Sequence, residues 1–322
     1  MVGTDIHLAA KNLEEGKLVA IPTETVYGLA ANAFNPTAVA QIYAVKNRPN
    51  FNPLIIHTDS LTKLQIWGLV LPQKMLALAS VFSPGPLTYV IPAGPQIPDI
   101  VTAGTGAVAV RIPNHPLTLA LLSKLYFPLA APSANPSGFV SPTTAEHVQA
   151  QLGNNISYIL DGGPCEVGVE STIISFLHDT PEILRYGGIG QEQIEAIIGA
   201  VIDKPATSKQ IITDNPVAPG QLAKHYATRH PLIHDNPNKH IQHYPHERIA
   251  IISFNNTYQQ VPLNQQKVLS PKADLAEAAQ QLFAAMREID TWDIDVILAE
   301  VFPDVGIGKA INDRLNRASN TG

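Results

Sequence analysis

Two cationic residues, Lys46 and Arg48, are separated by one residue and followed by a short loop bounded by prolines. In extended backbone, this spacing places both side chains on one face. Arginine and lysine are common phosphate ligands, arginine through its planar fork and lysine as a point charge. The alternative is a solvated helix C-terminus, where cations offset the helix dipole. Because the loop holds the amide of Asn52 between Pro49 and Pro53, we favour a bound anion.

Two further arginines stand at the ends of predicted strands. Arg111 ends the segment AVAVR, and Arg185 ends EILR. A strand-end arginine beside a hydrophobic core points to a carboxylate or phosphate partner, whereas a single one can equally be an ordinary surface residue. Since both lie in the same region as Lys46 and Arg48, we expect these cations to converge.

Two loops consist mainly of small polar residues. APSANPSGFVSPT spans residues 131–143, and GVEST spans residues 168–172. Loops without bulky side chains let the backbone approach a ligand closely, although a polar turn capped by Thr143 or Thr144 is the simpler alternative. No nucleophile is evident, because the chain has no Gly-x-Ser-x-Gly turn and its lone cysteine, Cys165, is more typical of a structural residue. The pattern favours positioning and electrostatic stabilisation of phosphate chemistry.

The surrounding sequence predicts the elements that must position these residues. Asn35 as N-cap and Pro36 as first helical residue predict a helix that ends before Pro49. Because strands and helices do not alternate strictly, we expect an α/β domain, α+β-like, with a twisted mixed sheet and flanking helices. Strands are predicted over residues 18–22, 54–57, 87–91, 107–112, 128–132, 157–161, 171–176 and 182–185, and further helices over residues 5–15, 61–67, 73–82, 116–125, 143–152 and 191–198.

Composition predicts three parts along the chain. Residues 1–200 contain the elements above and form the first domain. Residues 201–247 contain six prolines and few apolar runs, which is typical of a linker. Residues 248–322 predict a small α/β domain of Rossmann-like type. Within it, Ser270 and Pro271 predict the start of a helix of about nineteen residues.

The overall composition argues against several classes of protein. The 322 residues carry a net charge of −6, whereas proteins that bind nucleic acid through bulk charge are usually basic. One cysteine cannot form a disulfide within the chain or a cysteine-based zinc site. His240, His243 and His246 lie three residues apart, but no cysteine or clustered carboxylate completes a metal site. We therefore predict no metal site at these histidines, and whether protein side chains bind Mg²⁺ is left open. Without a signal-peptide pattern or an apolar run of about 18 residues, we expect a cytoplasmic protein with no membrane contact.

The order of the motifs resembles one enzyme family. PTETVYGL, KNRPNFNPL, SPGPLT, VAVRIP, APSANPSG, GVESTI and LRYGGI occur in the order and spacing of the threonylcarbamoyl-AMP synthases (L-threonylcarbamoyladenylate synthases). The family signature of Lys-x-Arg followed downstream by Ser-x-Asn is present as Lys46 and Arg48 with Ser133 and Asn135. The resemblance covers nearly the whole chain. It implies the two-domain form, with an N-terminal YrdC-like domain and a smaller C-terminal domain.

The resemblance implies a nucleotidyltransferase that makes threonylcarbamoyl-AMP and pyrophosphate from L-threonine, bicarbonate and ATP, with Mg²⁺ accompanying ATP. A downstream transfer enzyme would pass the threonylcarbamoyl group to adenosine next to the anticodon of certain tRNAs, giving N⁶-threonylcarbamoyladenosine. Contact of the chain itself with tRNA is left open. One alternative is an RNA-binding module that reads tRNA or double-stranded RNA through a cationic face, which the acidic balance argues against. Another is carbamoyl transfer from a different donor, because YrdC-like domains also occur in such enzymes.

Matching positions imply the ligands of each substrate. Arg111 would pair with the carboxylate of L-threonine, and Lys46 and Arg48 would be the catalytic residues because they would neutralise charge on the phosphates. The implied contacts of L-threonine are Thr25, His57, Arg111, the backbone of Ala131, and Ser171. The implied contacts of ATP are Arg48, Asn52, Ser133, Ser141 and Arg185, with Lys46 and Asn135 completing the signature and Ala107 adding a backbone contact.

The resemblance also assigns a role to the end of the proline-rich segment. Residues 217–227, VAPGQLAKHYA, resemble a segment that folds back over the site in this family. Tyr226 would reach the nucleotide, with His225 beside it. Closing such a lid would exclude water from a labile adenylate. The chain departs from the family pattern at Ala218 and Lys224, where serine and arginine are usual, so the roles of these two side chains stay open.

Overall fold

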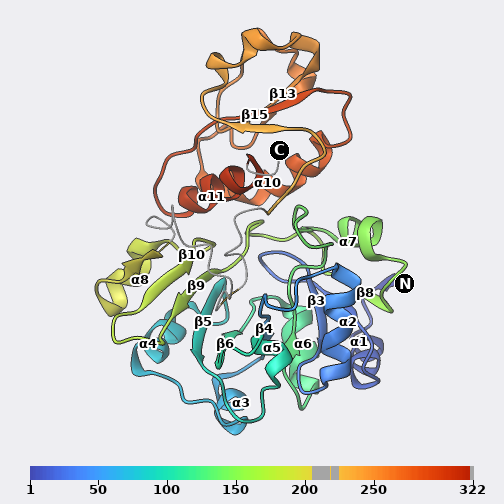
Figure 1. The fold of residues 1–322 in the computed structure, drawn as a ribbon, viewed down its shortest axis with the longest axis vertical. Coiled ribbons are helices and arrows are strands. Elements are labelled where there is room, and N and C mark those ends of the chain that lie inside the picture. The colour runs from blue at the N-terminus through green and yellow to red at the C-terminus, as the bar shows by residue number, and fades with distance from the viewer. Residues whose placement is uncertain (205–217, 219–224, 320–322) are drawn as a thin grey trace.

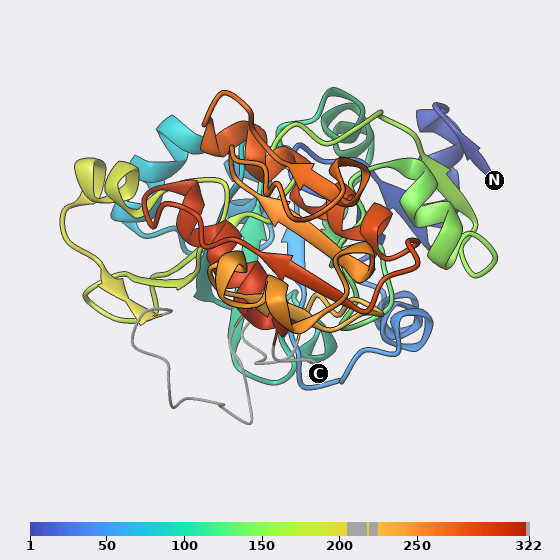
Figure 2. The ribbon, with the colours of Figure 1, turned by 90° about the horizontal axis from the view of Figure 1, so that it is seen from above.

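The chain folds around two separate β-sheets (Figure 1). The computed structural model describes residues 1–204, 218 and 225–319. The larger sheet has 11 strands in the order β1-β8-β2-β3-β7-β4-β6-β5-β9-β10-β11, and the smaller sheet has four strands in the order β12-β15-β13-β14. Seen from above, the small domain lies over the large one (Figure 2). No helix in the described parts of the chain is long and apolar enough to cross a membrane.

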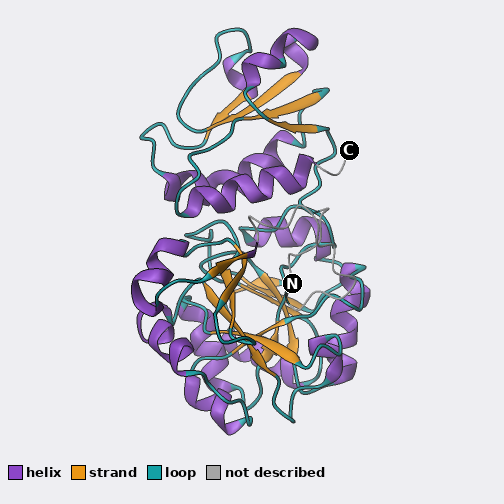
Figure 3. Cartoon of the chain, turned by 60° about the vertical axis from the view of Figure 1, so that its left-hand side comes forward, coloured by secondary structure: helices purple, strands orange, loops and turns teal. Residues whose placement is uncertain are grey.

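The large sheet mixes parallel and antiparallel neighbours, which confirms the predicted mixed sheet. For example, β2 pairs antiparallel with β3 and parallel with β8. Helices surround the strands of this domain (Figure 3). The strands are β1 (Val2–Gly3), β2 (Val19–Ile21), β3 (Gly28–Asn32), β4 (Ile55–His57), β5 (Leu87–Pro92), β6 (Ala107–Arg111), β7 (Leu129–Ala130), β8 (Tyr158–Leu160), β9 (Thr172–Ser175), β10 (Glu182–Arg185) and β11 (Ile202–Asp203).

Local signals in the sequence set the ends of the helices around this sheet. α2 begins where the Asn35 side chain accepts two backbone N–H groups, with Pro36 in the first turn, as predicted. It ends because Asn47 adopts a left-handed conformation with φ of 49°. The helices are α1 (Ile6–Glu14), α2 (Pro36–Lys46), α3 (Leu61–Ile66), α4 (Gln73–Phe82), α5 (Asp99–Thr102), α6 (Pro116–Lys124), α7 (Ala145–Leu152) and α8 (Gln191–Ile198).

The small domain contains a sheet in which all neighbouring strands are parallel. Its two long helices, α10 and α11, lie between that sheet and the large domain (Figures 1 and 3). This agrees with the predicted α/β domain. Its elements are β12 (Leu232–His234), η1 (Pro237–Lys239), η2 (Ile241–His243), η3 (His246–Arg248), β13 (Ile249–Ser253), η4 (Leu263–Gln265), β14 (Gln266–Val268), α10 (Leu275–Ile289), β15 (Val296–Ala299) and α11 (Ile307–Ser319).

The predicted helix start at Ser270 and Pro271 is wrong. α10 begins only at Leu275 and has 15 residues, with Asp274 as its N-cap. The chain cannot be helical before that point because Ala273 has a left-handed φ of 59°. The Ser270 hydroxyl instead accepts the Asp274 N–H at 2.8 Å. Ser270 therefore stabilises the turn that leads into the helix.

The predicted linker, residues 201–247, contributes one strand to each sheet. β11 extends the large sheet beside β10, and β12 forms an edge strand of the small sheet. The limits of the three predicted parts stay predictions. Residues 205–217 and 219–224, and with them the question about Lys224, lie outside the described residues.

One hydrophobic cluster crosses from one domain to the other. Val26, Val140 and Val169 of the large domain belong to the same buried cluster as Tyr226 and Phe283. Burial of apolar surface stabilises by about 25 cal/mol per Å². This cluster therefore holds the small domain against the loops that carry the predicted site residues.

Candidate active site

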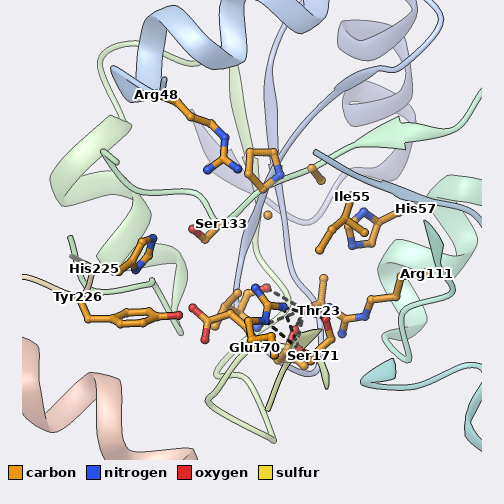
Figure 4. A pocket seen from close by; sticks show the side chains of 16 residues that line it. Thr23, Arg48, Ile55, His57, Arg111, Ser133, Glu170, Ser171, His225 and Tyr226 are labelled. Carbon is orange, nitrogen blue, oxygen red and sulfur yellow. Dashed lines mark hydrogen bonds between the residues drawn. The ribbon is translucent and has the colours of Figure 1, made fainter. Parts of the chain in front are cut away.

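A cavity of about 50 Å³ lies where several strands of the large sheet end (Figure 4). In that view, His225 and Tyr226 stand on one side and His57 and Arg111 on the other, while Arg48 approaches from a third direction. The lining residues are Thr23, Thr25, Val26, Gly28, Arg48, Ile55, His57, Arg111, Ala131, Pro132, Ser133, Glu170, Ser171, Arg185, His225 and Tyr226.

Every residue predicted to contact L-threonine lines this cavity. Strand pairing explains part of the convergence, because His57 at the end of β4 lies opposite Arg111 at the end of β6 in a parallel pair. Parallel strands end at the same edge of a sheet, so their last side chains meet there. The five residues are Thr25, His57, Arg111, Ala131 and Ser171.

Arg111 is held by a buried carboxylate that the sequence analysis missed. Its Nη2 lies 2.8 Å from Glu24 Oε1, and its Nε donates to the carbonyl oxygen of Gly85 at 3.3 Å. The two side chains are only 5% and 4% exposed. Burying either charge alone is costly, and pairing offsets much of that cost. The signal for Glu24 was its position directly before Thr25 in the TET segment.

Burial, and then the positive charge of Arg111, lower the pKa of His57 to about 3. The imidazole is therefore neutral near pH 7 and adds no second charge beside Arg111. Its Nδ1 has no hydrogen-bond partner among the described residues. Buried polar atoms almost always have a partner, so this atom fits a surface that receives a polar ligand.

The stability of the protein is expected to fall as the pH drops below about 6.5, partly through His57. The unfolded chain takes up a proton on this histidine near pH 6.5, whereas the native state does so only near its lowered pKa of about 3. The unfolded state therefore binds more protons in this window, and His57 alone removes up to about 1.4 kcal/mol per pH unit. Urea unfolding across the window measures this slope. His57→Gln should flatten it, and an unchanged slope would contradict a neutral His57.

Lys46 and Arg48 do not share one face of extended backbone, which corrects the sequence prediction. Lys46 ends α2, and the left-handed Asn47 turns the chain before Arg48. Arg48 lines the cavity, where its Nε and Nη2 donate to the carbonyl oxygens of Asn52 and Pro53 at 3.2 and 2.9 Å. Burial lowers the pKa of Arg48 to about 10. The proline-bounded loop therefore fixes the guanidinium through its backbone.

Lys46 lies behind the wall of the cavity and is 1% exposed. Its Nζ donates to the carbonyl oxygen of Ser133 at 2.6 Å and to that of Asn135. Burial, and then the charge of Arg48, hold the pKa of Lys46 well below its usual range. Lys46 thus joins the two halves of the Lys-x-Arg and Ser-x-Asn signature by direct hydrogen bonds.

Residues predicted to contact ATP divide into two groups. Arg48, Ser133, Arg185, His225 and Tyr226 line the cavity, whereas Asn52, Ala107, Asn135 and Ser141 are not among its lining residues. Two residues of the second group hold neighbouring segments through hydrogen bonds. The Asn135 amide donates to the carbonyl oxygen of Phe139 at 2.8 Å, and the Ser141 hydroxyl donates to Glu170 at 2.6 Å. Ala107 packs in a buried apolar cluster that includes Ala218.

Ser171 connects the two predicted subsites. Arg185 donates from Nε and Nη2 to the Ser171 carbonyl oxygen at 3.1 and 2.9 Å, and from Nη2 to the Ser171 hydroxyl at 3.1 Å. The same hydroxyl lies 2.7 Å from that of Thr88. Burial lowers the pKa of Arg185 to about 10, and the guanidinium stays charged near pH 7.

Tyr226 closes the side of the cavity that faces the small domain. It is 1% exposed, has a left-handed φ of 64°, and stacks on Phe283 of α10 with ring centroids 5.3 Å apart. The next residue, Ala227, donates its N–H to the carbonyl oxygen of Gly138 at 2.7 Å. Burial lowers the pKa of the neighbouring His225 to about 3, so its imidazole is neutral.

Two family descriptions match the chain in succession. Residues 11–187 match the family described as "Telomere recombination", and residues 189–320 match the "Threonylcarbamoyl-AMP synthase, C-terminal domain". A solved structure of Sua5 from Pyrococcus abyssi complexed with L-threonine superimposes with a TM-score of 0.91 at 38% identity. That match covers 98% of this chain and 94% of the other.

Curated relatives match either nearly the whole chain or a little more than half of it. The threonylcarbamoyl-AMP synthase of Bacillus subtilis is 42% identical over 320 residues, which cover 97% of this chain and 92% of the relative. A shorter synthase from Vibrio vulnificus is 37% identical over 188 residues, covering 57% of this chain and 99% of the relative. The chain therefore belongs to the threonylcarbamoyl-AMP synthase family, in the form with two domains.

Proposed function

We propose that this chain makes threonylcarbamoyl-AMP and pyrophosphate from L-threonine, bicarbonate and ATP. The observation that carries the proposal is one cavity lined by all the residues predicted for L-threonine and by five of those predicted for ATP. The product joins a carbamate of threonine to the α-phosphate of ATP, so both substrates must lie side by side. Ser171 accepts a hydrogen bond from Arg185 and lines the same cavity. The subsites for L-threonine and ATP would meet at this residue.

On the amino-acid side, Arg111 would hold the carboxylate of L-threonine while Glu24 holds Arg111. The hydroxyl groups of Thr25 and Ser171 and the neutral ring of His57 provide short polar contacts around it. Because His57 is uncharged, it would not repel the amine of the substrate. Hydrogen bonds to the substrate hydroxyl would discriminate against amino acids that lack one, since the buried polar groups would then stay unpaired.

On the nucleotide side, the reaction needs charge stabilisation and no protein nucleophile. The amine of L-threonine attacks bicarbonate, and water leaves to give the carbamate. A carbamate oxygen then attacks the α-phosphorus, the bond to the bridging oxygen breaks, and pyrophosphate leaves with that electron pair. Arg48 and Arg185 would neutralise charge on the phosphates, while Lys46 holds the Ser-x-Asn loop through its hydrogen bonds.

Mg²⁺ would enter the site with the phosphates of ATP and supply additional charge neutralisation there. The residues present do not fit a metal held by the protein. Glu24 is paired with Arg111 and Glu170 with Arg314, so both carboxylates near the cavity are engaged. Among the described residues, no group of three or more His, Cys, Asp or Glu side chains is arranged to bind a metal ion.

Tyr226 is proposed to act as the end of the lid. Ligand pockets usually measure about 300–1,000 Å³, so a cavity of about 50 Å³ must widen to admit a nucleotide. We expect Tyr226→Ala to shorten the lifetime of the bound adenylate by about tenfold, because water would reach it more easily. Single-turnover reactions followed by chromatography measure this lifetime. An unchanged lifetime would contradict the lid.

A pyrophosphate-release assay with ATP, bicarbonate and each amino acid in turn tests the reaction. We expect release with L-threonine and little with serine or valine, each of which lacks one group of the threonine side chain. Release with every amino acid, or with none, would overturn the assignment. Requiring carbamoyl phosphate in place of bicarbonate would favour carbamoyl transfer from another donor.

The RNA-binding alternative is not favoured, because the full-length relatives are synthases and the cavity is built for small molecules. We propose that a separate transfer enzyme consumes the adenylate and delivers its threonylcarbamoyl group to tRNA. Contact of this chain with tRNA, and its cytoplasmic location, remain predictions from the sequence.

A further inference from the structure

A buried arginine of the small domain reaches the site of the large domain. Arg314 lies in α11 and is 0% exposed. Its Nε lies 3.0 Å from Glu170 Oε2, and the other oxygen of Glu170 accepts the hydroxyl of Ser141 at 2.6 Å. Glu170 lines the cavity. An unbroken chain of contacts therefore runs from the small domain to a residue predicted to contact ATP.

The same arginine also supports the lid residue. The guanidinium carbon of Arg314 lies 5.6 Å from the centre of the Tyr226 ring, a distance at which cation–π attraction is significant. The ring of Phe283 packs against Tyr226 at an interplanar angle of 22°. Arg314 thus contacts two residues of the cavity lining, Glu170 and Tyr226, without lining the cavity itself.

A second arginine of the small domain holds the backbone of the same loop. Arg287 of α10 donates from Nε to the carbonyl oxygen of Ser141 at 3.3 Å, and from Nη2 to that of Val140. Its Nη2 also donates to Gln151 Oε1 at 2.8 Å. The small domain therefore holds the backbone of this loop directly through Arg287, and the Ser141 side chain indirectly through Arg314 and Glu170.

Charge explains why Glu170 needs such a partner. Burial alone would raise the pKa of Glu170, but Arg314 and then Arg185 lower it to about 2. An ionised carboxylate beside a phosphate subsite would repel ATP if it were unpaired. Pairing with Arg314 leaves Glu170 as an oriented acceptor for Ser141 and cancels most of that repulsion.

We propose that Arg314 is a positioning residue for ATP, acting from the small domain through Glu170 on Ser141 and through direct contact on Tyr226. The inference rests on the ATP-binding roles proposed above for Ser141 and Tyr226. Arg314 does not line the cavity, so it is not placed to touch the reacting atoms. The arginine therefore serves ATP affinity in the two-domain form, and the chemical step does not depend on it.

The test measures steady-state pyrophosphate release and ATP binding by calorimetry on full-length variants. Arg314→Gln should raise KM and Kd for ATP at least tenfold, while kcat and the KM for L-threonine stay within about threefold of the wild type. Arg314→Lys keeps a cation near Glu170 and should recover part of the affinity. Arg248→Gln is the matched control, because Arg248 pairs with Asp293 and Asp295 on the exposed side of the small domain.

A double mutant tests the route through Ser141. Because Arg314 also contacts Tyr226, the effects of Ser141→Ala and Arg314→Gln should overlap only in part: the double variant should weaken ATP binding by clearly less than the product of the two single effects. If the fold-changes in Kd for ATP of the two single variants simply multiply in the double variant, the route through Ser141 is overturned. If Arg314→Gln alone binds ATP within twofold of the wild type, the whole proposal is overturned. Should Arg314→Gln fail to fold, Arg314→Lys decides, because a rise in the KM for ATP of less than twofold would also overturn it.

Calorimetry separates this inference from the proposed reaction. Binding of ATP requires no turnover, so a wild-type protein that binds ATP without threonine-dependent pyrophosphate release would overturn the reaction alone. Normal release by the wild type together with unchanged ATP affinity in Arg314→Gln would overturn the role of Arg314 alone.

Discussion

Arg111→Gln is expected to lower kcat/KM for L-threonine by at least about 100-fold, because the substrate carboxylate would lose its charged partner. The same change leaves the carboxylate of Glu24 buried without its cation, which costs about 3–5 kcal/mol of stability. Pyrophosphate release at varied threonine concentration and urea unfolding measure the two effects separately.

A double variant distinguishes loss of binding from loss of folding. Glu24→Gln together with Arg111→Gln removes both charges, so it should recover most of the stability lost in Arg111→Gln. It should not recover activity, since the cation for the substrate is still missing. Full activity in the double variant would show that Arg111 acts on the fold and not on L-threonine.

Lys46→Ala and Arg48→Ala are each expected to lower kcat/KM for ATP by at least about 100-fold, for different reasons. Arg48 lines the cavity, so its loss would remove a cation proposed to lie beside the phosphates. Lys46 is buried behind Ser133 and Asn135, so its loss leaves two carbonyl oxygens without their donor and loosens that loop.

Stability measurements separate these two mechanisms. Lys46→Ala should lower the free energy of unfolding by about 1–3 kcal/mol more than a surface control such as Lys11→Ala. Arg48→Lys should recover part of the activity lost in Arg48→Ala, because the lysine ammonium restores the positive charge but not the planar, bidentate geometry of the guanidinium. If Lys46→Ala kept wild-type activity, the two halves of the signature would not need to be joined.

Elements with local signals were predictable from the sequence. For the helix α2, the N-cap Asn35 and the first-turn residue Pro36 are adjacent in the sequence and together predict the start, which the structure confirms. The helix near Ser270 was placed too early, because a serine followed by proline is equally compatible with a turn. The left-handed conformation of Ala273 delays the start of α10 to Leu275, and no neighbouring residue in the sequence predicts that conformation.

The buried charges around the cavity were not predictable in this way. Glu24 and Glu170 were missed because a carboxylate in a loop is usually exposed, and its burial depends on partners far along the chain. Glu170 pairs with Arg314, which is 144 residues away and in the other domain. The spacing of Lys46 and Arg48 gave the wrong geometry for a similar reason, since the conformation of Asn47 depends on how α2 ends.

The sequence by itself determined which chemistry the chain carries: its motifs, in their order, identified the family and many of the residues that line one cavity. Only the tertiary structure decided which of those residues line the cavity and which hold other residues in place. Arg48 lines the cavity while Lys46 holds a loop, and Arg111 and Ser141 each depend on a buried carboxylate. The physical reason is that a charge can be buried only where the fold brings a partner to it, and that partner can lie anywhere in the chain.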